Sequence, residues 1–94
     1  MMIVGILRIV LSIPGSDSLK DKRHVVKSIL DTCRNKFNVS AAEIDLLDVH
    51  RRAELAFACV SNDQQFVNKV LDKIMDTVES NPLCEVIESD MEFV

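Results

Sequence analysis

The sequence has 94 residues, of which 48% are hydrophobic and 28% are charged, and its formal net charge is −4 at pH 7. This length suits one domain with a single core, and the composition excludes a disordered chain. The acidic balance also excludes a uniformly basic nucleic-acid-binding protein. We therefore expect residues 1–94 to form one globular domain.

The charges are distributed unevenly along the chain. Residues 1–52 contain nine Lys and Arg against six Asp and Glu, whereas residues 53–94 contain two against nine. The two segments therefore carry formal charges of +3 and −7. A local basic site in the first segment is compatible with the acidic total.

The first predicted element is a strand over residues 2–13, which are rich in Ile, Val and Leu and end at the turn residues Pro14 and Gly15. Arg8 identifies its outer face, because side chains alternate between the two faces of a strand. Gly5 indicates close packing beneath a helix. The segment lacks the basic start of a signal peptide and is too short to span a bilayer, so we expect no membrane partner.

A helix is predicted to follow, with Ser18 as its N-cap and Asp21 three residues later. Apolar residues recur at helical spacing along one side of it. They are Leu19, Val25, Val26, Ile29, Leu30, Cys33 and Phe37. Residues 39–48 and 53–60 are then expected to form the two strands of a hairpin around the sequence DVHRRA.

The second helix is predicted to begin at Ser61, because Ser61 and Gln64 match a capping box. It is predicted to end before Asn81 and Pro82. The segment CEVIESDMEFV at residues 84–94 alternates as a final strand. Its core face is expected to carry Ile87, Met91 and Phe93, and its outer face Val86, Glu88, Asp90 and Glu92. All four Phe residues are assigned to the core.

The order strand, helix, strand, strand, helix, strand predicts an α+β fold, a sandwich of the ferredoxin-like type. The expected sheet is antiparallel and has four strands in the order 4-1-3-2, numbered along the chain. Two helices cover one face of this sheet and leave the other face open.

Three segments resemble the YlxP-like family (DUF503) of small bacterial proteins of unknown function. They are SLKDKR at residues 18–23, FNVSAAEID at 37–45 and RAELAFACVSND at 52–63. The similarity extends over nearly the whole chain and implies a ferredoxin-like fold, but no enzymatic activity. Genes of this family tend to lie near those of translation factors, which implies an association with RNA or the ribosome.

Basic side chains form a stripe along the first predicted helix, beside its apolar face. The stripe consists of Lys20, Arg23, Lys27 and Arg34, with Lys22 and Lys36 at the opposite edge. Cations in a first turn oppose the helix dipole, which favours a functional reason for them. We interpret five residues as phosphate contacts for RNA or ribosomal particles: Lys20, Lys22, Arg23, Lys27 and Arg34.

The alternative is an ordinary solvated helix face. Asp31 would then pair with Lys27 and Arg34, and Asp17 and Asp21 would offset the dipole penalty.

The predicted hairpin offers a candidate extension of the basic surface. Arg51 and Arg52 follow His50 there and are placed to bind an anion. The alternative is a solvated, charged turn in which Arg52 pairs with Glu54.

The open sheet face is a second candidate interface. Its apolar centre is expected to consist of Val4, Ile6, Val10, Ala56 and Ala58. Its edges are expected to carry Glu43, Asp45, Glu88, Asp90 and Glu92. Because it lacks aromatic side chains and has acidic edges, this face does not suit RNA and favours a homo-oligomer or a protein partner. The alternative is that scattered apolar residues there have no function.

No catalytic or metal-binding pattern is recognisable. His24 and His50 lie on separate predicted elements, and the chain has no glycine-rich loop or metal-ligand spacing. We expect no cofactor, no metal, no small-molecule substrate and no enzymatic activity. The widely spaced Cys33, Cys59 and Cys84 are expected to be buried thiols, which favours the reducing cytoplasm. The leading hypothesis is a non-enzymatic interaction module for RNA or the ribosome.

Overall fold

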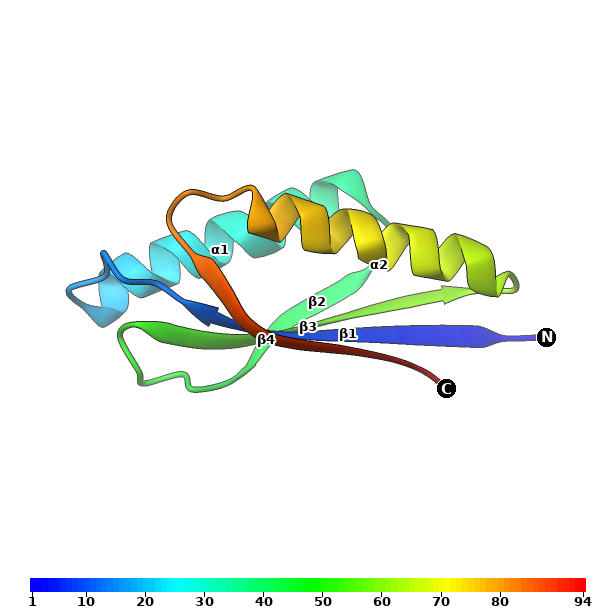
Figure 1. Ribbon diagram of the computed structural model, residues 1–94, viewed down its shortest axis with the longest axis horizontal. Coiled ribbons are helices and arrows are strands. Elements are labelled where there is room, and N and C mark those ends of the chain that lie inside the picture. The colour runs from blue at the N-terminus through cyan, green and yellow to red at the C-terminus, as the bar shows by residue number, and fades with distance from the viewer.

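The computed structural model describes residues 1–94 and contains six elements in the predicted order. They are β1 (Ile3–Ser12), α1 (Leu19–Lys36), β2 (Ser40–Asp45), β3 (Arg52–Ser61), α2 (Gln64–Glu79) and β4 (Glu85–Phe93). All strand pairs are antiparallel and the sheet order is β2-β3-β1-β4. Both helices lie on one side of the sheet (Figure 1). The predicted ferredoxin-like topology and strand order are confirmed.

The core lies between the sheet and the two helices, and β1 is at its centre because it pairs with both β3 and β4. Leu7, Ile9 and Leu11 point toward the helices and are at most 2% exposed. Their partners on β3 include Phe57, opposite Leu7, and Leu55, opposite Ile9. Each such side chain stabilises the fold by about 1.5–3 kcal/mol relative to an exposed one.

A β-bulge in β4 makes one part of the predicted alternation wrong. Glu88 pairs with Val10 and Val86 with Leu11, so Ile87 is an extra residue between two paired ones. Val86 therefore packs against the core, and Ile87 is exposed on the outside. An extra residue exchanges the two faces of a strand, and hydrophobic alternation alone does not locate it.

Helix α2 begins later than predicted. Its N-cap is Asp63, whose carboxylate accepts hydrogen bonds from the backbone N–H groups of Gln65 at 3.0 Å and Phe66 at 3.4 Å. Ser61 instead remains in β3, where it pairs with Ile3. Phe66, in the first turn of α2, faces outward and is 52% exposed.

The assignment of all four Phe residues to the core is also wrong. Phe57 is fully buried and Phe37 is half-buried, whereas Phe66 and Phe93 are exposed.

Strand β2 is shorter than predicted, because the chain turns directly after Asp45. Leu46 has a φ of 61°, in the left-handed region that non-glycine residues seldom adopt. Glu43 pairs with Leu55 in the sheet and faces the helices, not the open face as expected. No helix of the structure is both long enough and apolar enough to cross a membrane.

Gly5 confirms the close packing predicted for it. A Cβ atom at this position would collide with Val67 Cγ1 and would lie 3.0 Å from Leu71 Cδ1. Both side chains are fully buried, so neither has room to move away. The absence of a side chain at Gly5 is what lets α2 lie directly on β1.

We expect Gly5→Ala to lower the free energy of unfolding by about 1–3 kcal/mol, because it overpacks this contact. Gly15→Ala is the matched control, since no heavy atom lies within 4 Å of its added Cβ. Urea denaturation followed by circular dichroism measures both changes. Equal stability of the two variants would contradict the packing explanation.

Candidate nucleic-acid interface

Helix α1 begins with the predicted N-cap, Ser18. The hydroxyl of Ser18 accepts a hydrogen bond from the backbone N–H of Asp21 at 3.0 Å. The Asp21 carboxylate in turn accepts one from the backbone N–H of Asp17 at 3.1 Å. This carboxylate lies in the first turn of the helix and offsets part of the unfavourable interaction of nearby cations with the dipole.

Lys22 does not belong to an exposed basic surface, so its prediction as a phosphate contact is wrong. Its side chain is 0% exposed, and its Nζ lies 2.8 Å from Glu43 Oε2 on β2. The same ammonium group donates a hydrogen bond to the backbone carbonyl of Leu46. Lys22 therefore connects the core side of α1 to the point where β2 ends.

The Lys22–Glu43 contact is an ion pair without well-directed hydrogen bonding. The separation is short, but Glu43 Oε2 has no hydrogen-bond partner of acceptable geometry. The directed bond of Lys22 is the one to Leu46. Removing either charge would leave the other uncompensated in a site that water barely reaches.

Arg34 and Arg51 also bind backbone carbonyl groups of other segments. Arg34 donates to the carbonyl of Ala41 on β2, and its guanidinium lies 3.4 Å from Asp31. Arg51 donates to the carbonyl of Ser16 at 2.9 Å and contacts Asp17 at 3.4 Å. Both arginines therefore connect segments of the fold, and both side chains remain partly exposed to solvent.

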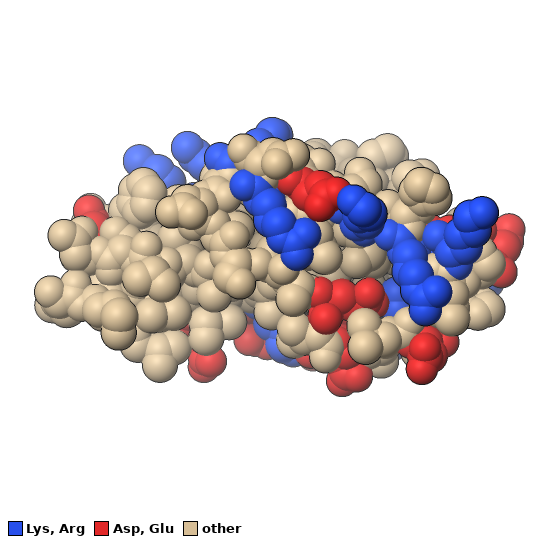
Figure 2. Space-filling view, turned by 180° about the vertical axis from the view of Figure 1, so that it is seen from behind, with Lys and Arg blue, Asp and Glu red and all other residues tan.

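The first two turns of α1 retain an exposed group of basic side chains. Lys20, Arg23, His24 and Lys27 line a shallow hollow on the surface, and we call this group the helix-one patch. Figure 2 shows basic side chains in a row across this side of the molecule, with acidic side chains among and below them. Lys20 and Arg23 make no ion pair, so their charges are available to a ligand.

Lys27 is exposed but has a partner. Its Nζ lies 2.7 Å from Asp31 Oδ2, one helical turn away, as the solvated-face alternative predicted. The hydrogen bond from Lys27 is the main cause of a lowered pKa of Asp31, and the charge of Arg34 adds to it. An anion that binds Lys27 must therefore compete with Asp31.

Arg51 and Arg52, the two arginines of the hairpin, have different surroundings. Arg52 is exposed and makes no ion pair, and the expected contact between Arg52 and Glu54 is absent. Glu54 instead contacts Arg8, at 3.3 Å. Arg52 therefore stays a candidate extension, whereas Arg51 is bound to the turn before α1.

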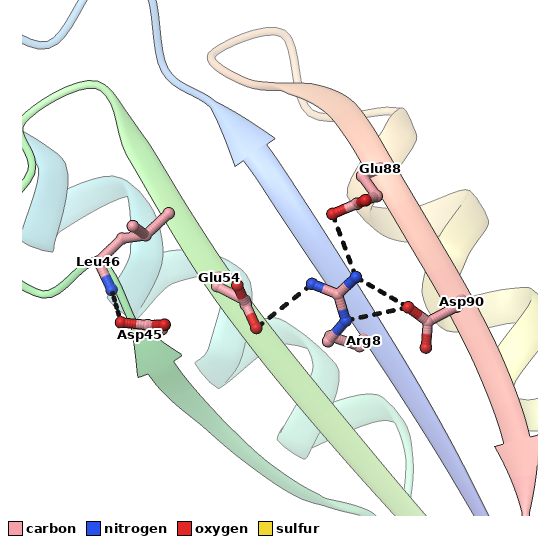
Figure 3. Close-up of polar contacts among 6 residues, drawn as sticks. All are labelled: Arg8, Asp45, Leu46, Glu54, Glu88 and Asp90. Atoms are coloured by element: carbon pink, nitrogen blue, oxygen red, sulfur yellow. Dashed lines mark hydrogen bonds and ion pairs between the residues drawn. The ribbon is translucent and has the colours of Figure 1, made fainter.

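The centre of the open sheet face is occupied by an ionic cluster (Figure 3). Arg8 on β1 contacts Glu54 on β3, and both Glu88 and Asp90 on β4, at distances between 2.8 and 3.3 Å. Hydrogen bonds to Glu88 and then Asp90 raise the pKa of Arg8 above its usual range. One cation among three carboxylates leaves this surface acidic, which disfavours a phosphate ligand here.

The apolar residues of the open face differ from the expected set. Val10 was predicted to contact a partner, but it is only 7% exposed and is therefore not available to one. Val4, Ile6, Ala56 and Ala58 are half-buried. A homo-oligomer through this face stays a prediction, and it would have to form around the acidic cluster of Arg8.

Comparison with known proteins assigns the family. Residues 4–91 match the family described as "Protein of unknown function (DUF503)", and the chain belongs to it. The chain is 40% identical over 68 residues to the "Uncharacterized protein YlxP" of Bacillus subtilis (strain 168), which covers 72% of this chain and 74% of that protein. The resemblance to the YlxP-like family is thus confirmed.

A solved structure, the de novo designed protein Foldit4, aligns with a TM-score of 0.58 over 100% of this chain and 97% of the designed one. Since only 12% of the residues are identical, this likeness shows the fold alone.

We expect Lys22→Ala to lower the free energy of unfolding by about 3 kcal/mol, because it leaves Glu43 and the Leu46 carbonyl without their partner. Lys20→Ala removes the same charge from an exposed site and should change stability by less than about 0.5 kcal/mol. Urea denaturation compares the two variants. If they lose the same stability, Lys22 is not the structural contact described here.

Proposed function

We propose that this protein is a non-enzymatic cytoplasmic interaction module that binds the phosphate backbone of structured RNA, free or within ribosomal particles. The contacts are made by Lys20, Arg23 and Lys27 of the helix-one patch. The observation that supports this is the exposed hollow lined by three cations and His24, in which Lys20 and Arg23 have no acidic partner.

The placement of these cations supports a ligand-binding role over a role in folding. The folding of this region uses Lys22, Arg34 and Arg51, each of which donates to a backbone carbonyl. Lys20 and Arg23 make no such bond, and they lie near the end of the helix where the dipole disfavours cations. A bound phosphate would compensate for this, because anions are stabilised by both the side chains and the helix terminus.

The patch is suited to positioning RNA and not to reading its sequence. Lys20, Arg23 and Lys27 extend over about 10 Å of helix, at a rise of about 1.5 Å per residue. Flexible cations arranged in this way bind phosphates, whereas base recognition needs groups held against base edges. The acidic cluster around Arg8 on the open face makes that face a poorer RNA site.

The cysteines support the proposed location and the absence of thiol chemistry. Cys33, Cys59 and Cys84 are free and buried. Burial raises the pKa of each thiol, so the reactive thiolate is disfavoured. Three free thiols are typical of a protein kept in a reducing compartment.

Removing the three cations of the patch should abolish binding to a blunt-ended RNA duplex, which has no unpaired loop. With three phosphate contacts, the logarithm of the association constant should fall with the logarithm of salt concentration with a slope of about −2 to −3. The Lys20→Ala, Arg23→Ala, Lys27→Ala variant should lose binding, as measured by titration calorimetry at two salt concentrations.

The matched control is Lys36→Ala, Lys69→Ala, Lys73→Ala, which removes the same charge outside the patch and should leave duplex binding within about twofold. The proposal fails if the unmodified protein does not bind at low salt, or if the two triple variants weaken binding equally.

Asp31→Asn should strengthen duplex binding by roughly two- to fivefold, because it frees Lys27 from its surface ion pair. Asp76→Asn removes the same charge from α2 and serves as the control. The same calorimetric titration measures both variants. Unchanged or weaker binding by Asp31→Asn would show that Lys27 does not contact the RNA.

A further inference from the structure

A second groove lies between the C-terminal end of α1 and the N-terminal half of α2. Its volume is about 360 Å³, within the range of small-molecule sites in proteins. The residues that matter most for its chemistry are Lys36, Phe37, Phe66, Lys69, Val70 and Lys73. No acidic residue lines it.

Two aromatic side chains give this groove its apolar character. Phe66 is 52% exposed and Phe37 is half-buried, so each offers ring surface to a ligand. Val70 packs against the core beside them, and the buried Cys59 also lines the groove. An exposed Phe side chain is unusual for a residue whose only role is to fill the core. The exposed surface of Phe66 and Phe37 is where a flat aromatic group of a ligand would stack.

Three lysines surround the aromatic surface, and none of them makes an ion pair. Lys36 extends from the last turn of α1, and Lys69 and Lys73 are one turn apart on α2. Clustered ammonium groups attract an anion, and Lys binds phosphate as a point charge. Asn38, which also lines the groove, provides an amide donor and an acceptor.

We propose that this groove binds a nucleotide, with its base stacked on Phe66 and Phe37 and its phosphate held by Lys36, Lys69 and Lys73. Aromatic rings beside cations are the combination with which proteins bind single-stranded nucleic acids, since every base has a face that can stack. An acidic peptide matches the charge, but the paired rings and the amide of Asn38 match a base better.

This site is separate from the helix-one patch and does not depend on it. At about 100° per residue, Lys36 lies roughly 160° around α1 from Lys20 and faces the α2 side. A blunt-ended RNA duplex exposes phosphates, but its bases are paired and stacked and it has no unpaired loop, so it is a ligand for the patch only. An unpaired nucleotide is the ligand for the groove.

Calorimetry and ¹H–¹⁵N NMR spectra of the full chain test this binding with unlabelled ligands. The ligands are adenosine 5′-monophosphate, single-stranded octaadenylate and inorganic phosphate. We expect both nucleotide ligands to shift the signals of Phe37, Phe66 and Val70, and phosphate alone to bind at least tenfold more weakly. Tighter binding of the octanucleotide assigns the site to a strand, and equal binding assigns it to a free nucleotide.

Phe66→Leu keeps an apolar side chain but removes the stacking surface, and it should weaken nucleotide binding by about tenfold. Lys69→Gln with Lys73→Gln should weaken it by a similar factor and reduce its salt dependence. The Lys20→Ala, Arg23→Ala, Lys27→Ala variant should leave it within about twofold. No shift at the groove with either nucleotide overturns the proposal, as does binding of phosphate alone with equal strength. Binding of an acidic peptide without nucleotide binding also overturns it.

Discussion

The buried ammonium group of Lys22 fixes the edge strand β2 against α1, the helix that carries the candidate site. Strand β2 has six residues at the edge of the sheet, and Ala41 is its one buried residue. Apolar packing therefore holds this strand weakly. Lys22 compensates by binding Glu43 within β2 and the carbonyl of Leu46 at its end, where the backbone adopts its unusual φ. An edge strand held by cations in this way keeps its register although it contributes little to the core.

Arg34 and Arg51 also fix the β2–β3 hairpin by donating hydrogen bonds to backbone carbonyl groups. Arg34 binds the carbonyl of Ala41 near the start of β2, and Arg51 binds that of Ser16 before α1. Six of the nine basic residues in the first half of the chain thus belong to two groups. One group satisfies backbone carbonyls and fixes the hairpin, and the other, consisting of Lys20, Arg23 and Lys27, stays on the surface. The excess of positive charge in residues 1–52 is therefore only partly available for binding.

The fold was predictable because hydrophobic periodicity changes clearly between strand and helix along this chain. The capping residues Ser18 and Asp21 could also be predicted, since they depend on local geometry. The packing role of Gly5 was predicted from a glycine inside a strand, although the contact with Val67 and Leu71 is tertiary. The burial of Lys22 could have been predicted from its helical spacing, but a lysine is normally assigned to the surface. Lys22, Val26, Ile29 and Cys33 follow the spacing i, i+4, i+7 and i+11, which places Lys22 within the buried stripe.

Other features could not be predicted from local patterns. The bulge at Ile87 depends on pairing with β1, and the cap at Asp63 depends on β3 continuing to Ser61. The groove brings Phe37 and Phe66 together from two helices, a contact that only the tertiary packing creates.

The exposed and the buried cations of α1 have different roles, and an NMR footprint of a blunt-ended RNA duplex on the isotope-labelled protein measures this difference directly. We expect the largest shifts at Lys20, Arg23, His24 and Lys27, while the side-chain signal of Lys22 does not move. Shifts concentrated on Val4, Ile6 and Ala58 of the open sheet face, with none on α1, would contradict this expectation.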